Sequence, residues 1–196
     1  MSSPVVPRWE WRAFGRSFGP AEERFRALSP ERVQETDELY VLSKRVDENV
    51  KVRDGLLDVK QLEHVNAEGL EQWVPVLKEP FPIIASTAAA VLGRLAVAVP
   101  SLEHDAYTLD ELVQELVAPS PDLRAVQVHK RRQRYTIGGC MTELTDLRTD
   151  VGETRTVAVE SEEPDRVVAT VRELGLASFA NTSFPKGLEA LALDAQ

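Results

Sequence analysis

Charged and bulky residues alternate along much of this chain, which is the pattern of a β-strand whose two faces meet different surroundings. In residues 8–14 (RWEWRAF), Arg8, Glu10 and Arg12 fall on one face and the two tryptophans fall on the other. Alternating segments of this kind predict eight strands, at residues 8–14, 35–43, 49–53, 56–62, 72–78, 125–137, 140–147 and 153–161.

Turn-forming residues separate several of these segments. Asp54-Gly55 stands between two alternating runs, which is the strongest local signal for a β-hairpin. Gly138-Gly139 marks a second turn between two long expected strands. Pro75 lies inside an expected strand, where a proline predicts an edge or a bulge. Runs joined by such short turns are typical of an antiparallel sheet.

Apolar residues at helical spacing predict the remaining elements, which are helices at 20–28, 83–99, 109–117 and 164–174 and a short element at 182–188. Thr108 is a candidate N-cap, and Gly175 follows the end of the fourth helix. Helices stand between the two halves of the strand set and near its end, which is an α+β pattern. Because no change of composition marks a boundary, we expect a single domain over residues 1–196.

Composition excludes several classes of protein. The chain is 43% hydrophobic, enough for a sizeable core in which the three tryptophans are expected to pack. A net charge of -9 and an aromatic content of 6% argue against a nucleic-acid-binding protein. Its one cysteine, Cys140, can form no intrachain disulfide, which fits a reducing compartment. The apolar stretch at 81–99 contains Pro82, Gly93 and Arg94, which favours a packed helix over a membrane span. We therefore expect a cytoplasmic protein that binds neither nucleic acid nor membrane.

Like charges gather on single faces of the expected strands. Lys51 and Arg53 share one face, and Lys130, Arg132 and Arg134 share another. The simplest interpretation is that these faces meet solvent, as one face of an antiparallel sheet usually does. Like charges on one face repel, however, so such a cluster also suits contact with an anion.

A barrel with a polar lumen would gather these basic faces around a polyanion such as a chain of phosphates. The apolar faces would then lie outside, under the helices, and the residues expected there are Val50, Val52, Val128 and Val157. Three carboxylates, Glu10, Glu160 and Glu162, could hold a divalent cation that bridges phosphate oxygens.

Short motifs, most of them built on charged residues, follow one another along most of the chain. The motifs in order are Arg8-x-Glu10-x-Arg12, Thr36-Asp37 with Tyr40, Lys51-x-Arg53, Lys60, Lys130-x-Arg132 with Arg134, Glu143 and Asp146, Glu160-x-Glu162, and Ser183-Phe184-Pro185-Lys186. Each motif alone is common, whereas their order and spacing over one chain are specific. From residue 8 to residue 188 the chain resembles the CYTH superfamily, the triphosphate tunnel metalloenzymes.

The resemblance implies a fold and a site. The fold is an eight-stranded antiparallel β-barrel tunnel with flanking helices. The family binds triphosphate groups through basic wall residues, which here correspond to Arg12, Lys51, Arg53, Lys60, Lys130, Arg132, Arg134 and Lys186. It binds Mg²⁺ or Mn²⁺ through glutamates, which here correspond to Glu10, Glu160 and Glu162. The implied catalytic residues are Lys60, Arg132, Glu143 and Asp146, with either acidic residue as the group that orients the attacking water.

The implied function is metal-dependent hydrolysis of a triphosphate, either inorganic tripolyphosphate or an organic triphosphate. The first motif departs from the family pattern, because Arg8 replaces its first glutamate and Arg12 replaces its lysine. This departure leaves open whether one or two metal ions bind and whether the chain is active. Two alternatives therefore stay open. One is a degenerate, non-catalytic module for polyphosphate or nucleotides, and the other is an adenylate cyclase or polyphosphate polymerase of the same superfamily.

Overall fold

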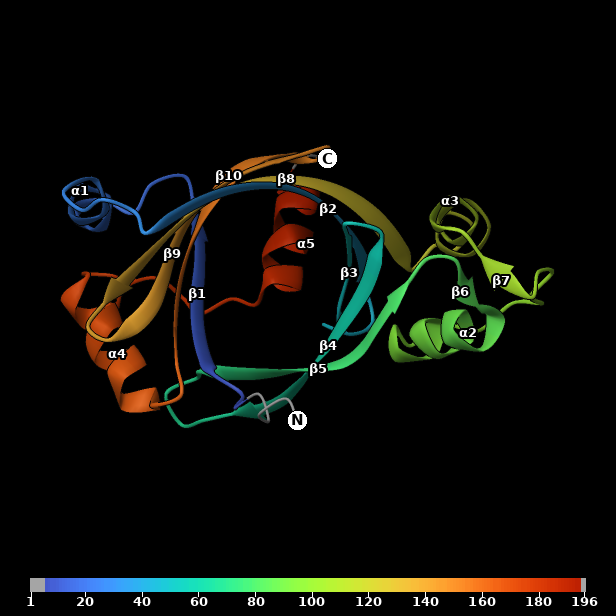
Figure 1. The fold of residues 1–196 in the computed structure, drawn as a ribbon, viewed down its shortest axis with the longest axis horizontal. Coiled ribbons are helices and arrows are strands. Elements are labelled where there is room, and N and C mark those ends of the chain that lie inside the picture. Colours follow the sequence, from blue (N-terminus) through green and yellow to red (C-terminus); the bar gives the residue numbers. More distant parts are fainter. Residues whose placement is uncertain (1–5, 195–196) are drawn as a thin grey trace.

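The structure is a computed structural model that describes residues 6–194. Eight antiparallel strands close into a barrel in the order β1-β10-β9-β8-β2-β3-β4-β5, since β1 pairs with both β10 and β5 (Figure 1). Their bounds are β1 (Trp9–Gly15), β2 (Arg32–Ser43), β3 (Asn49–Arg53), β4 (Leu56–Val65), β5 (Glu71–Pro80), β8 (Leu123–Ile137), β9 (Cys140–Thr149) and β10 (Gly152–Ser161). The predicted α+β fold with an eight-stranded antiparallel barrel is confirmed, and it is the fold that the CYTH resemblance implies.

Local sequence accounts for a turn and a bulge in the barrel. Asp54 and Gly55 have φ angles of 52° and 72°, and two consecutive left-handed residues form the turn that matches the twist of a hairpin. Pro75 lies opposite Lys60 at a shift of register between β4 and β5, so the bulge is the one of the two expected alternatives that occurs.

Helices cover the outward apolar faces on two sides of the barrel. On one side, α1 (Pro20–Arg26) and α4 (Pro164–Glu173) pack over β1, β9 and β10, where Phe25 and Val167 join the same buried cluster as Val157 (Figure 1). On the other side, a segment at residues 83–117, called here the side lobe, covers β3 and β4, where Val50 and Val52 are buried. The sequence predicts that the apolar faces of the strands lie outside the barrel under helices, and these buried faces agree with it.

The side lobe differs in detail from its prediction. The expected helix at 83–99 begins with the short strand β6 (Ile83–Ile84), which pairs with β7 (Ala106–Tyr107), and its helical part is α2 (Ala85–Arg94). The expected helix at 109–117 is α3 (Leu109–Glu111) followed by the π-helical turn η1 (Leu112–Val117). Thr108 is the N-cap of α3, as the sequence predicts, and it also forms a capping box with Glu111. No helix within residues 6–194 is long and apolar enough to cross a membrane.

The last helix, α5 (Phe184–Asp194), lies within the outline of the barrel (Figure 1). Its Leu188 packs with Val126 and Val128 of β8, so this part of the lumen is apolar. The expectation that Val128 points away from Lys130 is therefore wrong, because residues two apart on a strand share a face. A β-carbon at Gly187 would overlap the ring of Phe14, which shows how closely α5 fits this end.

Candidate active site

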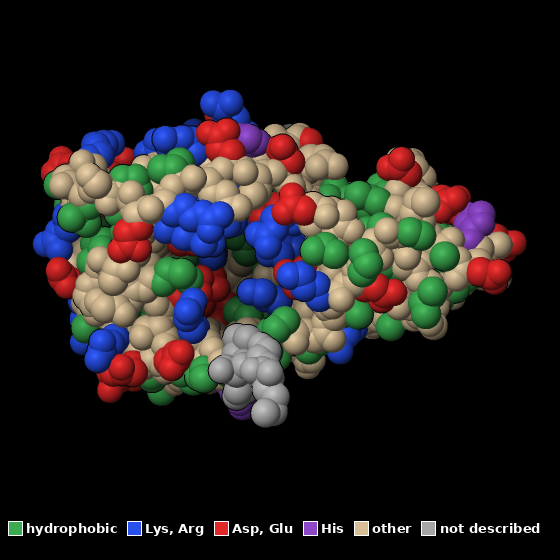
Figure 2. Space-filling view, viewed as in Figure 1, with side chains coloured by type: hydrophobic (Ala, Val, Ile, Leu, Met, Phe, Trp, Pro, Cys, Tyr) green, Lys and Arg blue, Asp and Glu red, His purple; other side chains and the backbone are tan. Residues whose placement is uncertain are grey.

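The remaining part of the lumen is a polar cavity of about 280 Å³. All eight barrel strands and α5 contribute to its wall, through Glu10, Arg12, Tyr40, Asn49, Lys51, Arg53, Asp58, Lys60, Trp73, Lys130, Arg132, Arg134, Met141, Glu143, Thr145, Glu160 and Phe184. Figure 2 shows a hollow near the centre of this face, with Lys and Arg side chains around it. Every predicted phosphate-binding residue except Lys186 lines the cavity, because period-2 alternation turns each basic face inward.

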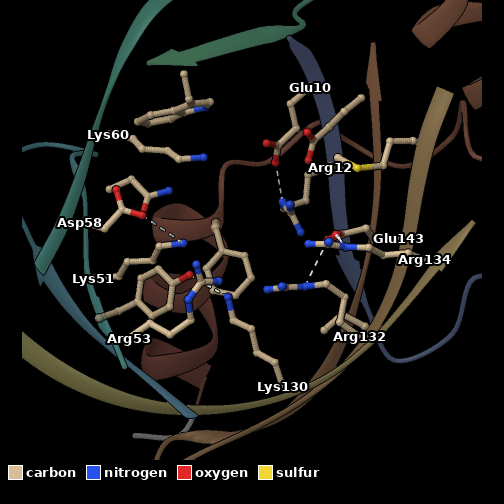
Figure 3. Close-up of a pocket in the computed structure, with 17 residues that line it drawn as sticks. Glu10, Arg12, Lys51, Arg53, Asp58, Lys60, Lys130, Arg132, Arg134 and Glu143 are labelled. Atoms are coloured by element: carbon tan, nitrogen blue, oxygen red, sulfur yellow. Dashed lines mark hydrogen bonds and ion pairs between the residues drawn. The ribbon is translucent and has the colours of Figure 1, made fainter. Parts of the chain in front are cut away.

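Charge is unevenly distributed over the cavity wall. In Figure 3, Lys51, Arg53 and Lys60 point inward from one side, while Glu10 and Glu143 lie on the opposite side. Arginines lie on this side too, since Arg12 donates a hydrogen bond to Glu10 and Arg134 donates one to Glu143. A basic wall suits phosphate oxygens, and a carboxylate wall suits a hard divalent cation.

A buried carboxylate that the motifs do not include, Glu38, lies behind the basic side. Its side chain is 0% exposed and accepts hydrogen bonds from Lys130 Nζ and Tyr40 Oη, both at 2.9 Å. Burial alone would raise the pKa of Glu38, but the charges of Lys130 and Lys51 lower it to about 2. The sequence does contain one indication that Glu38 belongs to the site. Glu38 shares a face of the expected strand at 35–43 with Tyr40, which is part of a family motif.

Lys130 is the most enclosed cation of the site, with a side chain that is 4% exposed. Its Nζ donates to Tyr40 Oη at 2.7 Å and lies 3.7 Å from the ring centroid of Phe184. Burial lowers the pKa of Lys130, and Glu38 acts in the opposite direction. The distance of 2.9 Å between Lys130 Nζ and Glu38 Oε2 makes the two residues a buried ion pair.

Three carboxylates face the cavity from the other side. Arg12 Nε donates to Glu10 Oε1 at 2.6 Å, and Arg134 Nε donates to Glu143 Oε1 at 2.8 Å. Burial, together with the nearby carboxylates of Glu10 and Glu143, raises the pKa of Glu160 to about 7. Crowded carboxylates of this kind would gain from a divalent cation, so the donor set is chemically suitable for Mg²⁺ or Mn²⁺.

The metal-free protein should become less stable as Glu160 ionises. Because its pKa rises from 4.5 to about 7 on folding, protonated Glu160 favours the folded state. This contribution is complete below pH 4.5 and is lost as the pH rises through about 7. We expect the unfolding free energy to fall over that range, and Glu160→Gln to flatten the fall. Urea unfolding at about pH 5 and about pH 8, with chelator present, measures both slopes. Identical pH profiles for the two proteins would contradict this prediction.

Asp146 does not belong to the cavity, which corrects its implied catalytic role. It lies on the outer face, where it accepts a hydrogen bond from Arg155 Nε at 2.8 Å and faces Arg131 at 3.7 Å. The reason is strand parity, since Asp146 comes three residues after Glu143 on β9 and must point the other way. It cannot orient a water molecule inside the barrel.

Two further implied residues also lie outside the cavity wall. Lys186 of α5 pairs with Asp47 at 2.9 Å and is half exposed, and it does not line the cavity. Glu162 follows the end of β10 and is exposed. It lines a neighbouring hollow together with Glu10 and Glu160, which also line the cavity, so it lies beside the implied metal site and outside the cavity wall.

Several residues that line the cavity are not part of any motif in the sequence. Trp73 was expected in the core, but it lines the cavity and donates from Nε1 to Glu71 at 3.0 Å. Asp58 shares a strand face with Lys60 and faces Lys51 across β3 and β4 at 3.8 Å. Alternation alone identifies Asp58 as inward, whereas the position of Trp73 depends on the bulge in β5.

The cavity carboxylates do not form a compact three-ligand cluster as they stand. Within residues 6–194, the one group of three His, Cys, Asp or Glu residues whose ligand atoms all lie within 4.8 Å of one another is His104, Glu111 and Glu115. That group belongs to the side lobe, where Glu111 also completes the capping box of α3. A cation at Glu10 and Glu160 would therefore need further oxygen ligands, which the phosphates of a substrate can supply.

Comparisons with known proteins place few constraints on this chain. No family model matches it, and no curated protein sequence does. One similar solved structure is the putative adenylyl cyclase HpAC1 from Hippeastrum, described as having a dominant triphosphatase activity, with 14% identity over 96% of each chain and a TM-score of 0.48. Others are a conserved hypothetical protein from Pyrococcus furiosus (15% identity, 91% of this chain and 98% of that chain, TM-score 0.49) and a putative adenylate cyclase from Bacillus halodurans (12%, 91% and 96%, TM-score 0.45). Because these identities and TM-scores are low, the activities of those proteins are not transferred to this chain.

Proposed function

We propose that this chain is a metal-dependent triphosphate hydrolase of the CYTH type, which binds its substrate in the barrel cavity. The observation that carries the proposal is the set of basic residues from four strands, β1, β3, β4 and β8, around one cavity of about 280 Å³. A tripolyphosphate chain offers several charged oxygens at close spacing, and such a wall matches them with charge-assisted hydrogen bonds. Glu10 and Glu160, which line the same cavity, would provide ligands for a cation that accompanies the phosphates.

Phosphoryl transfer depends mainly on positioning and on neutralisation of charge. Lys51 and Arg53 would hold non-bridging oxygens of the chain, while Lys60 and Arg132 would contact the phosphoryl group that is transferred. Mg²⁺ or Mn²⁺, held by Glu10 and Glu160, would neutralise charge on the phosphate oxygens.

Glu143 has a narrower role in this proposal than the resemblance implies. One of its oxygens accepts from Arg134 at 2.8 Å, and the other faces Arg132 Nε at 3.4 Å. A carboxylate engaged in this way positions the two guanidinium groups and is poorly placed to orient a water molecule. Glu143 is therefore a positioning residue here.

A second candidate function is a phosphate-binding module without turnover. It is favoured by Arg12, whose guanidinium contacts Glu10 at 2.6 Å and so neutralises one of the two metal ligands proposed above. The two functions separate in a panel of tripolyphosphate, ATP and thiamine triphosphate, each with and without Mg²⁺ and Mn²⁺. Metal-dependent phosphate release supports the hydrolase, and binding without release supports the module. Cyclic AMP or a long-chain product would instead indicate a cyclase or a polymerase.

The metal assignment gives a sharp comparison between two glutamates of one segment. Glu160→Gln is expected to lower metal-dependent turnover about 10-fold or more, which is about 1.4 kcal/mol of transition-state stabilisation. Glu162 is exposed just beyond the end of the same strand, so Glu162→Gln should change turnover less than about twofold. Phosphate release measured against Mn²⁺ concentration tests both variants. Equal losses in the two variants would contradict the placing of the metal ligand at Glu160.

A further inference from the structure

Glu38 occupies an unusual place for a carboxylate in a site that is built to hold anions. It lies on β2, between the two strands that carry most of the basic wall, and its backbone faces Arg53 on β3 and Val128 on β8. Its side chain is completely buried. A buried charge persists only with partners, so the groups around Glu38 show what it does.

Cations of the cavity surround this carboxylate. Lys130 Nζ lies 2.9 Å from Glu38 Oε2, while Arg132 and Arg53 lie 3.6 and 3.7 Å from Oε1. The same three cations line the cavity. A negative charge this close opposes their attraction for any second anion, since charge interactions are strong where water is largely excluded.

We propose that Glu38 is an internal counter-anion, which competes with a phosphate-bearing ligand for Lys130, Arg132 and Arg53. It stabilises the ligand-free barrel by neutralising cations that would otherwise repel one another, and it lowers the affinity of the cavity for polyanions. The inference rests on the proposed function, since it concerns the same cavity and the same class of ligand. It adds a residue that limits binding where the other residues promote it.

The opposite role predicts the opposite sign. If Glu38 only oriented the three cations for the ligand, removing its charge would weaken anion binding. If Glu38 competes with the ligand, removing its charge strengthens binding while the ligand-free protein loses stability. Affinity and stability therefore move in opposite directions only under the competition model.

The experiment compares the wild type with Glu38→Gln, which keeps the shape of the side chain and removes its charge. The matched control is Glu35→Gln on the same strand, because Glu35 is exposed and faces Arg131 on the outer surface at 3.8 Å. Tripolyphosphate is titrated calorimetrically into each full-length protein with chelator present, so that hydrolysis plays no part. Glu38→Gln is expected to lower the dissociation constant about 10-fold or more, and Glu35→Gln to leave it within about twofold. Thermal unfolding without ligand should show a lower midpoint for Glu38→Gln.

Each outcome decides the inference separately from the proposed function. Equal or weaker binding by Glu38→Gln overturns the inference and leaves the hydrolase proposal, which metal-dependent phosphate release tests, untouched. Binding by Glu38→Gln but not by the wild type supports the inference, and metal-dependent phosphate release by the wild type then decides the proposed function separately. Binding by neither protein overturns the inference, because the three cations are then unavailable even without Glu38.

A second variant covers the case in which Glu38→Gln does not fold. The double variant Lys130→Met with Glu38→Gln leaves no buried unpaired charge and frees Arg132 and Arg53. It is expected to bind tripolyphosphate at least as tightly as the wild type, although it has one cation fewer. Weaker binding by this variant overturns the inference.

Discussion

Lys130→Met is expected to lose about 3–5 kcal/mol of unfolding free energy, which is the usual effect of breaking a buried ion pair from one side. The side chains of Lys130 and Glu38 are 4% and 0% exposed, so the substitution leaves a buried carboxylate without its nearest cation. Methionine fills a similar volume and keeps an apolar contact with Phe184, so packing contributes little to the difference. Urea unfolding at neutral pH measures the loss.

The double variant with Glu38→Gln is the control for this prediction. Replacing both charged partners removes the unpaired charge, and most of the lost stability should return. The deficit of the single variant should also shrink in acid, because Glu38 without Lys130 takes up a proton more readily than in the wild type, where its pKa is about 2. A loss below about 1 kcal/mol, the value of an exposed pair, would contradict a buried ion pair at this position.

The strands and the basic lumen were predictable because both depend on local patterns. Alternation in a strand fixes which residues share a face, and turns such as Asp54-Gly55 fix where the chain reverses. Once the strands close into a barrel, every basic face identified from the sequence must point to one side. The inward positions of Lys51, Arg53 and Arg132 follow from that rule alone.

The same rule explains two errors, at Asp146 and Val128. The family motif assigned Asp146 to the site, although it lies an odd number of residues from Glu143 on one strand. The sequence analysis expects Val128 on the outer face of the barrel, although Val128 lies two residues from the inward-facing Lys130. Correct parity would have corrected both assignments without a structure.

Other features could not be predicted, because they depend on which strands become neighbours. Glu38 meets Lys130 because β2 pairs with β8, although 92 residues separate the two in sequence. The apolar end of the lumen exists because α5 packs inside the barrel, and a short amphipathic segment gives no sign of where it will dock. Long-range pairing of this kind is set by the whole fold.

Arg132→Ala is expected to raise the dissociation constant for tripolyphosphate about 10- to 150-fold. Charge-assisted hydrogen bonds to phosphate contribute about 1.5–3 kcal/mol each, and that range converts to these factors. The fold should survive, because Glu143 keeps Arg134 at 2.8 Å and Glu38 keeps Lys130 at 2.9 Å. Calorimetric titration with chelator present measures the change.

The adjacent residue is the matched control. Arg131 carries the same charge on the same strand, but it is 46% exposed and pairs with Glu35 and Asp146 on the outer face. Arg131→Ala should change the dissociation constant less than about twofold, because exposed charges at this distance are screened by salt. Similar losses in both variants would mean that the protein attracts the ligand through its general field. A large loss at Arg132 alone, which persists at high salt, would mean that the inward face of β8 contacts the phosphates.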